Sequence, residues 1–114
     1  MRATLSKEER LSGKTAIAAL VSKGRWGSTP HVKYCVYNGN GLEINRIMVS
    51  VPKKFFKRAV KRNLLKRRLR EAYRTQKELL AVTGRDIMFV WSSPEVSDYC
   101  VIRAEMEDIL KSVR

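Results

Sequence analysis

Apolar positions recur along this chain with two different periods, and each period predicts a different kind of element. Residues 12–23 and residues 98–113 carry apolar side chains three or four positions apart, which predicts amphipathic helices near both ends. Gly24 follows the first of these segments and is expected to end that helix. The stretch after Pro52 keeps the helical period to about Val82, so we predict a long helix in the middle of the chain.

Strand patterns lie between these helices. Residues 32–37 are rich in aromatic and β-branched side chains and predict a strand. Residues 38–41, with the sequence NGNG, predict a tight turn, and residues 42–51 are expected to return beside the first strand as a hairpin. Residues 86–91 form a nearly continuous apolar run, which is typical of a central strand covered on both faces. Residues 25–30 are expected to form a loop, and the fold class is α+β.

The length and composition are typical of a single globular domain. The chain has 114 residues, of which 44% are hydrophobic, so residues 1–114 are expected to fold around one modest core. No apolar run approaches the roughly 18 to 20 residues that a membrane span needs. The amino terminus lacks the apolar stretch of a secretory signal, so we expect a cytoplasmic protein. Cys35 and Cys100 lie in apolar segments and are expected to be buried free thiols.

The positive charge of the chain is concentrated in one segment. The formal net charge is +13, and residues 53–74 contain eleven basic side chains opposed only by Glu71, which gives this segment +10 of the total. Like charges packed this closely repel one another, and a polyanion would relieve the repulsion. Nucleic acid is the expected partner, because neutralised phosphates also release counterions. An acidic membrane surface is a weaker alternative, since it would favour bulky apolar residues free to insert opposite the charges.

A helical arrangement of this segment separates two faces. One apolar stripe is expected to be core, and it consists of Leu65, Leu69, Ala72, Tyr73, Gln76, Leu79 and Leu80. A second face, which we call the basic row, consists of Asn63, Arg67, Arg70 and Arg74. A guanidinium can bind two phosphate oxygens at once, and an Asn side chain can accept a hydrogen bond from a 2′-hydroxyl. The basic row therefore predicts a surface that binds RNA.

The basic segment also resembles the signature of a known family. The stretch RNLLKRRLRE, which follows VSVPKKFFKRAVK, is similar to the motif of the bacterial ribonuclease P protein component. The positions that agree with the family motif are Ala59, Val60, Arg62, Asn63, Lys66, Arg67, Arg70 and Glu71. Leu64 departs from the motif, because the family usually has a further Arg at that position. The order of the expected elements is similar to that of the family over nearly the whole chain.

This resemblance implies a fold and a function. The family fold is a compact αβββαβα sandwich with a mixed four-stranded sheet and a left-handed βαβ crossover, although general handedness rules favour the opposite crossover. The family protein pairs with a large catalytic RNA, which uses Mg²⁺ to remove the 5′ leader from precursor tRNA. The implied partners are that catalytic RNA, with one protein per RNA, and precursor tRNA, with no membrane and no small-molecule substrate. The implied RNA-binding residues are Lys53, Lys54, Arg58, Arg62, Asn63, Lys66, Arg67, Arg70 and Arg74.

The resemblance further implies a cleft for the leader strand between the first helix and the sheet. Ile17 and Val21 occupy positions where the family often has Phe, and Tyr37 matches a family Tyr on the strand. Alternation along that strand places Lys33 on the face of Tyr37, and it places Tyr34 on the opposite face, where it is expected to be core. The implied leader-binding residues are therefore Ile17, Val21, Lys33 and Tyr37. Because the Phe rings are missing, we expect electrostatic contacts with the leader backbone to matter more here.

Catalytic and metal-binding motifs are missing from the sequence. His31 is the only histidine and is expected to be structural or solvated. Glu105 and Asp108 are one helical turn apart, but we expect them to face solvent rather than to bind a metal ion. We therefore expect no catalytic residue in the protein, and we expect Mg²⁺ to be used by the partner RNA. Two alternatives stay open, a ribosomal or assembly RNA-binding protein and a DNA-binding regulator. The regulator would need a partner helix just before the basic helix, where this sequence predicts a strand ending at Pro52.

Overall fold

Four strands pair into one mixed sheet within residues 7–113, the part of the chain that the computed structural model describes. They are β1 (Arg25–Ser28), β2 (Val32–Asn38), β3 (Arg46–Ser50) and β4 (Arg85–Trp91). Their order across the sheet is β1-β2-β4-β3. β2 is antiparallel to both of its neighbours, whereas β3 is parallel to β4. The mixed four-stranded sheet implied by the family resemblance is therefore confirmed.

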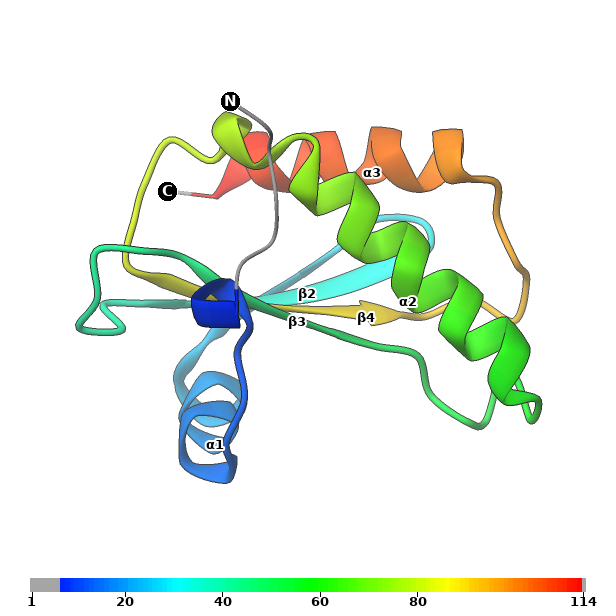
Figure 1. Ribbon diagram of the computed structural model, residues 1–114, viewed down its shortest axis with the longest axis horizontal. Coiled ribbons are helices and arrows are strands. Elements are labelled where there is room, and N and C mark those ends of the chain that lie inside the picture. The colour runs from blue at the N-terminus through cyan, green and yellow to red at the C-terminus, as the bar shows by residue number, and fades with distance from the viewer. Residues whose placement is uncertain (1–6, 114) are drawn as a thin grey trace.

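Helices cover both faces of this sheet (Figure 1). α1 (Lys14–Lys23) lies on one face, and α2 (Ala59–Arg74) and α3 (Tyr99–Ser112) lie next to each other on the opposite face. Two short 3₁₀ turns, η1 (Lys7–Glu9) and η2 (Lys77–Leu79), precede α1 and follow α2. The arrangement is an α+β sandwich in the order αβββαβα, as predicted.

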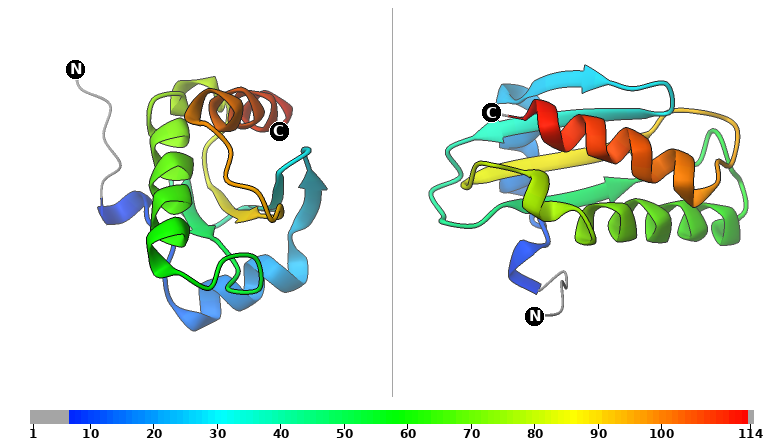
Figure 2. Two further views of the ribbon diagram at one scale, coloured as in Figure 1. Left: turned by 90° about the vertical axis from the view of Figure 1, so that its right-hand side faces the viewer. Right: turned by 90° about the horizontal axis from the view of Figure 1, so that it is seen from above.

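The connection from β3 through α2 to β4 joins two neighbouring parallel strands. In the right-hand view of Figure 2 the two long helices lie in front of the sheet, the parallel strands β3 and β4 both run to the right, and β4 lies above β3. The crossover is therefore left-handed, against the general preference and as the family resemblance implies. It places α2 along the β3 edge of the sheet, with one side toward the core and one side outward.

The predicted hairpin is wrong, because β4 lies between β2 and β3. Gly39 and Gly41 do take the positive φ angles of a tight turn, 77° and 81°. The backbone N–H groups of Gly39 and Asn40, however, donate to the carbonyl of Gly84 at 3.0 and 2.9 Å, so the turn is tied to the start of β4. The apolar side chains of β4 are buried on both faces, which favours a paired strand on each side of it. The strand after the turn begins only at Arg46.

The predicted loop over residues 25–30 is also wrong in its first part. Residues 25–28 form β1, which pairs with β2 along its whole length. A Cβ atom on Gly27 would lie 2.4 Å from the ring of Tyr34, so a side chain at this position would have to displace that ring. A four-residue strand with a glycine inside it lacks the apolar alternation that identifies longer strands.

α2 ends at Arg74, well before its predicted end. The side chain of Gln76 donates hydrogen bonds to the carbonyls of Ala72 and Arg103, at 3.1 and 3.0 Å, and so fastens the end of α2 to α3. Leu80 is still buried beyond this turn. The apolar pattern therefore continues after the helix has ended, because the following chain packs against the same core.

Two apolar clusters, one on each face of the sheet, hold the layers together. The larger cluster joins the sheet to α2 and α3, and Leu65 and Leu69 of the predicted core stripe are fully buried in it. The smaller cluster lies under α1 and consists of Leu11, Leu20, Cys35 and Met88. Burial in this cluster raises the pKa of the Cys35 thiol. Cys100 is exposed, so the prediction of two buried thiols holds only for Cys35.

A polar cluster ties the turn between β1 and β2 to α3. Glu105 is 8% exposed, so the prediction that it faces solvent is wrong, whereas Asp108 is exposed as predicted. The Glu105 carboxylate accepts hydrogen bonds from Thr29 Oγ1 at 2.5 Å and from the His31 backbone N–H at 2.8 Å, and it lies 2.6 Å from His31 Nδ1. The His31 ring stacks on Trp91 with centroids 5.6 Å apart, so this histidine is structural. Burial alone would raise the pKa of Glu105, but these hydrogen bonds outweigh burial and lower that pKa.

We expect Leu69→Ala to lower the free energy of unfolding by about 2 to 5 kcal/mol, because the truncation leaves a cavity under α2. Leu69 is fully buried, whereas Arg67 is exposed on the outer side of the same helix. Arg67→Ala is the control and should change the free energy of unfolding by less than about 0.5 kcal/mol. Chemical denaturation measures both values, and equal losses would contradict the assignment of the two faces.

We expect Glu105→Gln to lower the free energy of unfolding at neutral pH by about 1 to 3 kcal/mol, because Thr29 and His31 lose a charged acceptor. The pKa of Glu105 in the folded state lies below its ordinary value of 4.5. The contribution of the carboxylate is therefore complete above that value and is lost as the pH falls through the lower, folded-state pKa. Denaturation at a series of pH values should show the variant approaching the wild type only below about pH 4.5. Asp108→Asn is the control on the same helix, and a difference that stays constant down to strong acid would exclude this role of Glu105.

Candidate nucleic-acid interface

α2 presents three members of the basic row to solvent. Asn63, Arg67 and Arg70 are exposed, while Leu65 and Leu69 on the other side of the helix are fully buried. Within residues 7–113, the side chains of these three residues make no hydrogen bond or ion pair with the protein. Their donors are therefore available to an external acceptor, and the core holds the backbone that carries them.

Arg74, the last member of the basic row, is paired within the protein. Its guanidinium contacts both carboxylate oxygens of Glu71, one turn earlier, with Nε 3.1 Å from Oε2. The hydrogen bonds from Arg74 lower the pKa of Glu71. Glu71, the one acid of the basic segment, therefore neutralises part of the charge of Arg74. The groups of the basic row that can bind an external partner lie mainly between Asn63 and Arg70.

Arg62 is also engaged by the protein. Its Nη1 donates to the carbonyls of Phe56 and Lys57, at 2.7 and 2.8 Å, and so closes the loop that leads into α2. These carbonyls precede the first turn of the helix, where no side chain caps the backbone. Arg62 therefore orients the start of α2, in addition to the role in RNA binding that its position in the motif implies.

The other predicted RNA-binding cations surround the start of α2. Lys53, Lys54 and Arg58 are exposed, and Lys66 is half-buried. The Nζ of Lys54 lies 5.0 Å from the centre of the Phe55 ring, a contact that helps to orient the ammonium group. The positive end of the helix dipole adds to these charges. An anion that approaches the start of α2 therefore meets positive charge from the helix, the loop and the basic row together.

The fold adds a cation that sequence reasoning missed. Arg10 and Arg70 line one groove of about 300 Å³ over β3, together with Ser12 and the apolar residues of the strand. Arg10 is held there because its segment forms a parallel bridge with Ile47 of β3. No spacing in the sequence relates position 10 to position 70, because only the tertiary fold brings the amino-terminal segment beside α2.

The predicted leader-binding residues share the α1 face of the sheet. Tyr37 and Ile17 are half-buried and pack against the small core under α1. Val21 is 45% exposed, and Lys33 is exposed farther along β2. Tyr34 packs against the large core on the opposite face, so the predicted assignment of the two faces of β2 is confirmed. The structure therefore brings Ile17 and Tyr37 together, with Lys33 at a distance along the strand.

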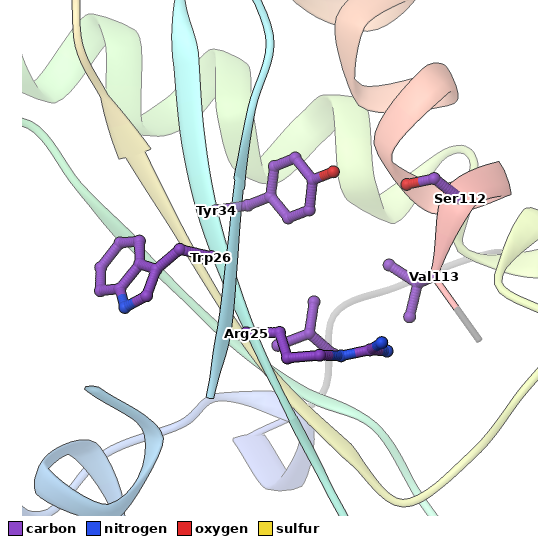
Figure 3. Close-up of a pocket in the computed structure, with 6 residues that line it drawn as sticks. Arg25, Trp26, Tyr34, Ser112 and Val113 are labelled. Atoms are coloured by element: carbon purple, nitrogen blue, oxygen red, sulfur yellow. The ribbon is translucent and has the colours of Figure 1, made fainter. Parts of the chain in front are cut away.

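Trp26 is a second surface residue that sequence reasoning missed, because β1 was expected to be loop. Figure 3 shows Trp26 pointing away from the side of the strands that faces Ser112 and Val113, while Tyr34 points toward that side. On that side, a pocket of about 250 Å³ lies between the β1–β2 pair and the end of α3. Trp26 opposes Cys35 in the β1–β2 register and therefore belongs to the α1 face, together with Lys33.

Two further properties concern the part of the chain that the structure describes. Among residues 7–113, no three His, Cys, Asp or Glu side chains come together as a group that could hold a metal ion. None of the helices in this range combines the length and the apolar composition that crossing a membrane requires.

Comparisons with known proteins agree with one family. The sequence pattern of the family described as Ribonuclease P matches residues 5–114. The ribonuclease P protein component of Porphyromonas gingivalis is 35% identical over 114 residues, which cover 93% of this chain and 83% of that protein. The ribonuclease P protein component of Borrelia hermsii is 37% identical over 109 residues, covering 94% of this chain and 91% of that protein.

Solved structures show the same fold. The RNase P protein of Thermotoga maritima superposes with a TM-score of 0.81 at 24% identity, covering 93% of this chain and 98% of that one. The RNase P protein of Staphylococcus aureus gives a TM-score of 0.79, also at 24% identity, over 90% of this chain and 93% of that one. The chain is thus a basic α+β sandwich with an exposed cationic helix. It belongs to the ribonuclease P protein component family, as the motif around Asn63 indicated.

We expect Arg62→Ala to lower the free energy of unfolding by about 1 to 3 kcal/mol even without RNA, because two loop carbonyls lose a charged donor. Lys61→Ala is the matched control, since Lys61 is the exposed neighbour with the same charge. Chemical denaturation of the protein alone measures the effect. A loss confined to RNA binding, with unfolding unchanged, would show that Arg62 does not organise the start of α2.

Proposed function

We propose that this chain is the protein subunit of a ribonuclease P, which binds the catalytic RNA and assists removal of the 5′ leader from precursor tRNA in the cytoplasm. Membership of the family supports this proposal. The observation that carries it is the exposure of Asn63, Arg67 and Arg70, without partners among the described residues, on a helix whose other side is core. In the proposed complex one protein binds one catalytic RNA.

In this proposal α2 is the docking element for the catalytic RNA. Arg67 and Arg70 bind phosphate oxygens, and Asn63 contacts a 2′-hydroxyl or a base edge. Arg10 extends the same surface, because it lines the same groove as Arg70. Lys53, Lys54 and Arg58 add contacts at the start of the helix. The segment of residues 53–74 carries +10, so docking also gains from counterion release, and affinity falls as salt rises.

The protein contributes binding and positioning, and the RNA carries the chemistry. We assign the Mg²⁺ ions to the RNA partner, as the resemblance to the family implies. The α1 face takes the leader of precursor tRNA in this proposal, with Lys33 contacting its backbone and Tyr37, Ile17 and Val21 offering apolar surface. By holding the leader, the protein favours substrates that carry one.

Reconstitution tests this proposal directly. The protein is combined with a bacterial ribonuclease P RNA and labelled precursor tRNA at low Mg²⁺ concentration, and removal of the leader is followed with and without protein. The expected result is faster cleavage at the normal site when the protein is present. If the protein instead leaves the rate unchanged and binds a ribosomal RNA fragment more tightly, it is an assembly protein rather than a ribonuclease P subunit.

We expect Arg67→Ala and Arg70→Ala each to weaken binding to the catalytic RNA by about 1 to 3 kcal/mol while leaving the fold intact. Each change should also flatten the dependence of log Kd on log salt by about 1, because one phosphate contact is lost. Arg103→Ala removes the same charge from the exposed side of α3 and is the matched control. Equal losses for Arg103→Ala and Arg67→Ala would mean that net charge, and not α2, determines binding.

A further inference from the structure

An exposed indole stands at the edge of the sheet. Trp26 is 51% exposed, although tryptophan is one of the side chains that gains most from burial. The other tryptophan of the chain, Trp91, is fully buried. A large aromatic surface left in water is a common property of binding positions, where a ring can pack against a partner.

The structure fixes this indole on one side of β1. Trp26 opposes Cys35 in the register, and the Cys35 Sγ in turn lies 3.3 Å from the carbonyl oxygen of Leu20 in α1. The next residue, Gly27, lies against the ring of Tyr34, so a side chain at this position would have to displace that ring. The opposite side of the β1–β2 pair is therefore occupied by Tyr34, and Trp26 stays on the α1 face (Figure 3).

The surroundings of the indole favour an anionic partner. Trp26 lines a hollow of about 330 Å³ with Gly27, Ser28 and Lys33. Lys33 is exposed, and none of these four residues carries a carboxylate. An aromatic face beside a cation is the combination that binds single-stranded nucleic acid, because the ring stacks on a base and the cation contacts the adjacent phosphate.

The sheet connects this hollow to the basic segment. Ser28 opposes Lys33, Lys33 opposes Val90, and Val90 opposes Ser50, so these residues form one row across all four strands on the α1 face. The row is exposed or half-buried from end to end. Three spacings between strands amount to roughly 14 Å. Ser50 leads directly into the loop that carries Lys53 and Lys54, so a short single strand can reach from that loop to Trp26.

We propose that Trp26 stacks on an unpaired base of the RNA substrate, with Lys33 holding the neighbouring phosphate. The proposal rests on the proposed function, since it makes the β1 edge part of the path of the leader. It also supplies the aromatic ring that Ile17 and Val21 cannot provide. A second copy of the chain is a poorer occupant of this face, because each chain carries a net charge of +13 and the two copies repel one another.

Tryptophan fluorescence tests the contact without the catalytic RNA. A short single-stranded oligouridylate is titrated into the wild-type protein and into Trp26→Phe, which retains only the buried Trp91. Quenching of the wild-type emission, absent from the variant, is the expected result. An emission unchanged by RNA would overturn the proposal. So would an emission that depends on protein concentration alone, because that result would mean that a second copy covers this face.

Substrate binding by the reconstituted holoenzyme provides the second measurement. Trp26→Leu, which removes the ring, is expected to weaken binding of precursor tRNA with a long leader roughly 5- to 100-fold. Trp26→Phe should keep most of that affinity, and neither change should matter when the leader is cut back to its last nucleotides. Val101→Ala shortens an apolar side chain on α3 that is 38% exposed and is the control.

The outcomes separate this inference from the proposed function. Base stacking at Trp26 is excluded if the Trp26→Leu and Trp26→Phe variants bind the long-leader substrate with equal affinity. It is also excluded if the variants lose as much affinity for the substrate with a short leader as for the one with a long leader. If the wild-type protein fails to activate the catalytic RNA, the proposed function fails, and the oligouridylate titration still decides whether Trp26 stacks on RNA.

Discussion

The placement of β4 between β2 and β3 is the constraint on which the rest of the structure depends. β4 is apolar on both faces, so it takes a paired strand on each side and a helical layer above and below. Once β4 separates the two strands of the expected hairpin, α2 has to cross from the edge strand β3 to the strand beside it. That path leaves α2 at the rim of the sheet, with one side on the core and the other outward. The exposure of the basic row is thus a consequence of where an apolar strand is buried.

The fold tolerates the concentrated positive charge of residues 53–74 because it keeps the charged side chains out of the core and pairs some of them with acceptors in the protein. Arg62 closes the loop before α2, and Arg74 is held by Glu71, so both arginines stabilise the scaffold locally. Asn63, Arg67 and Arg70 make no such contacts within residues 7–113. The basic segment therefore contains some side chains that stabilise the helix and its entry loop, and others that are exposed to a partner. The arginines of both groups carry the same charge, so charge alone does not predict this division.

The sequence predicts correctly those features that depend on a single helix or strand. The faces of α2, the helix of residues 98–113, and the two sides of β2 follow from local periodicity, and the motif around Asn63 indicated the family. The failures concern contacts between distant segments. Residues 38–41 form the predicted turn, but the strands on its two sides do not pair with each other. The backbone N–H groups of this turn donate to the carbonyl of Gly84 instead. β1 was missed because Gly27 interrupts its pattern, and Trp26 was missed with it. Glu105 was assigned to solvent because its partners lie at the β1–β2 turn, far away in the sequence.

The Glu105 cluster has a consequence for how the molecule is made. Its carboxylate orders the turn through Thr29, a residue 76 positions earlier in the chain. During synthesis, the amino-terminal strands emerge long before α3, so the turn between them waits for the last helix before it is fixed. α2 also packs against α3, and Gln76 fastens the end of α2 to it, so the cationic helix waits for the same last element. Both sides of the protein, the cationic helix and the rim beside Lys33, are therefore fixed only when the chain is nearly complete.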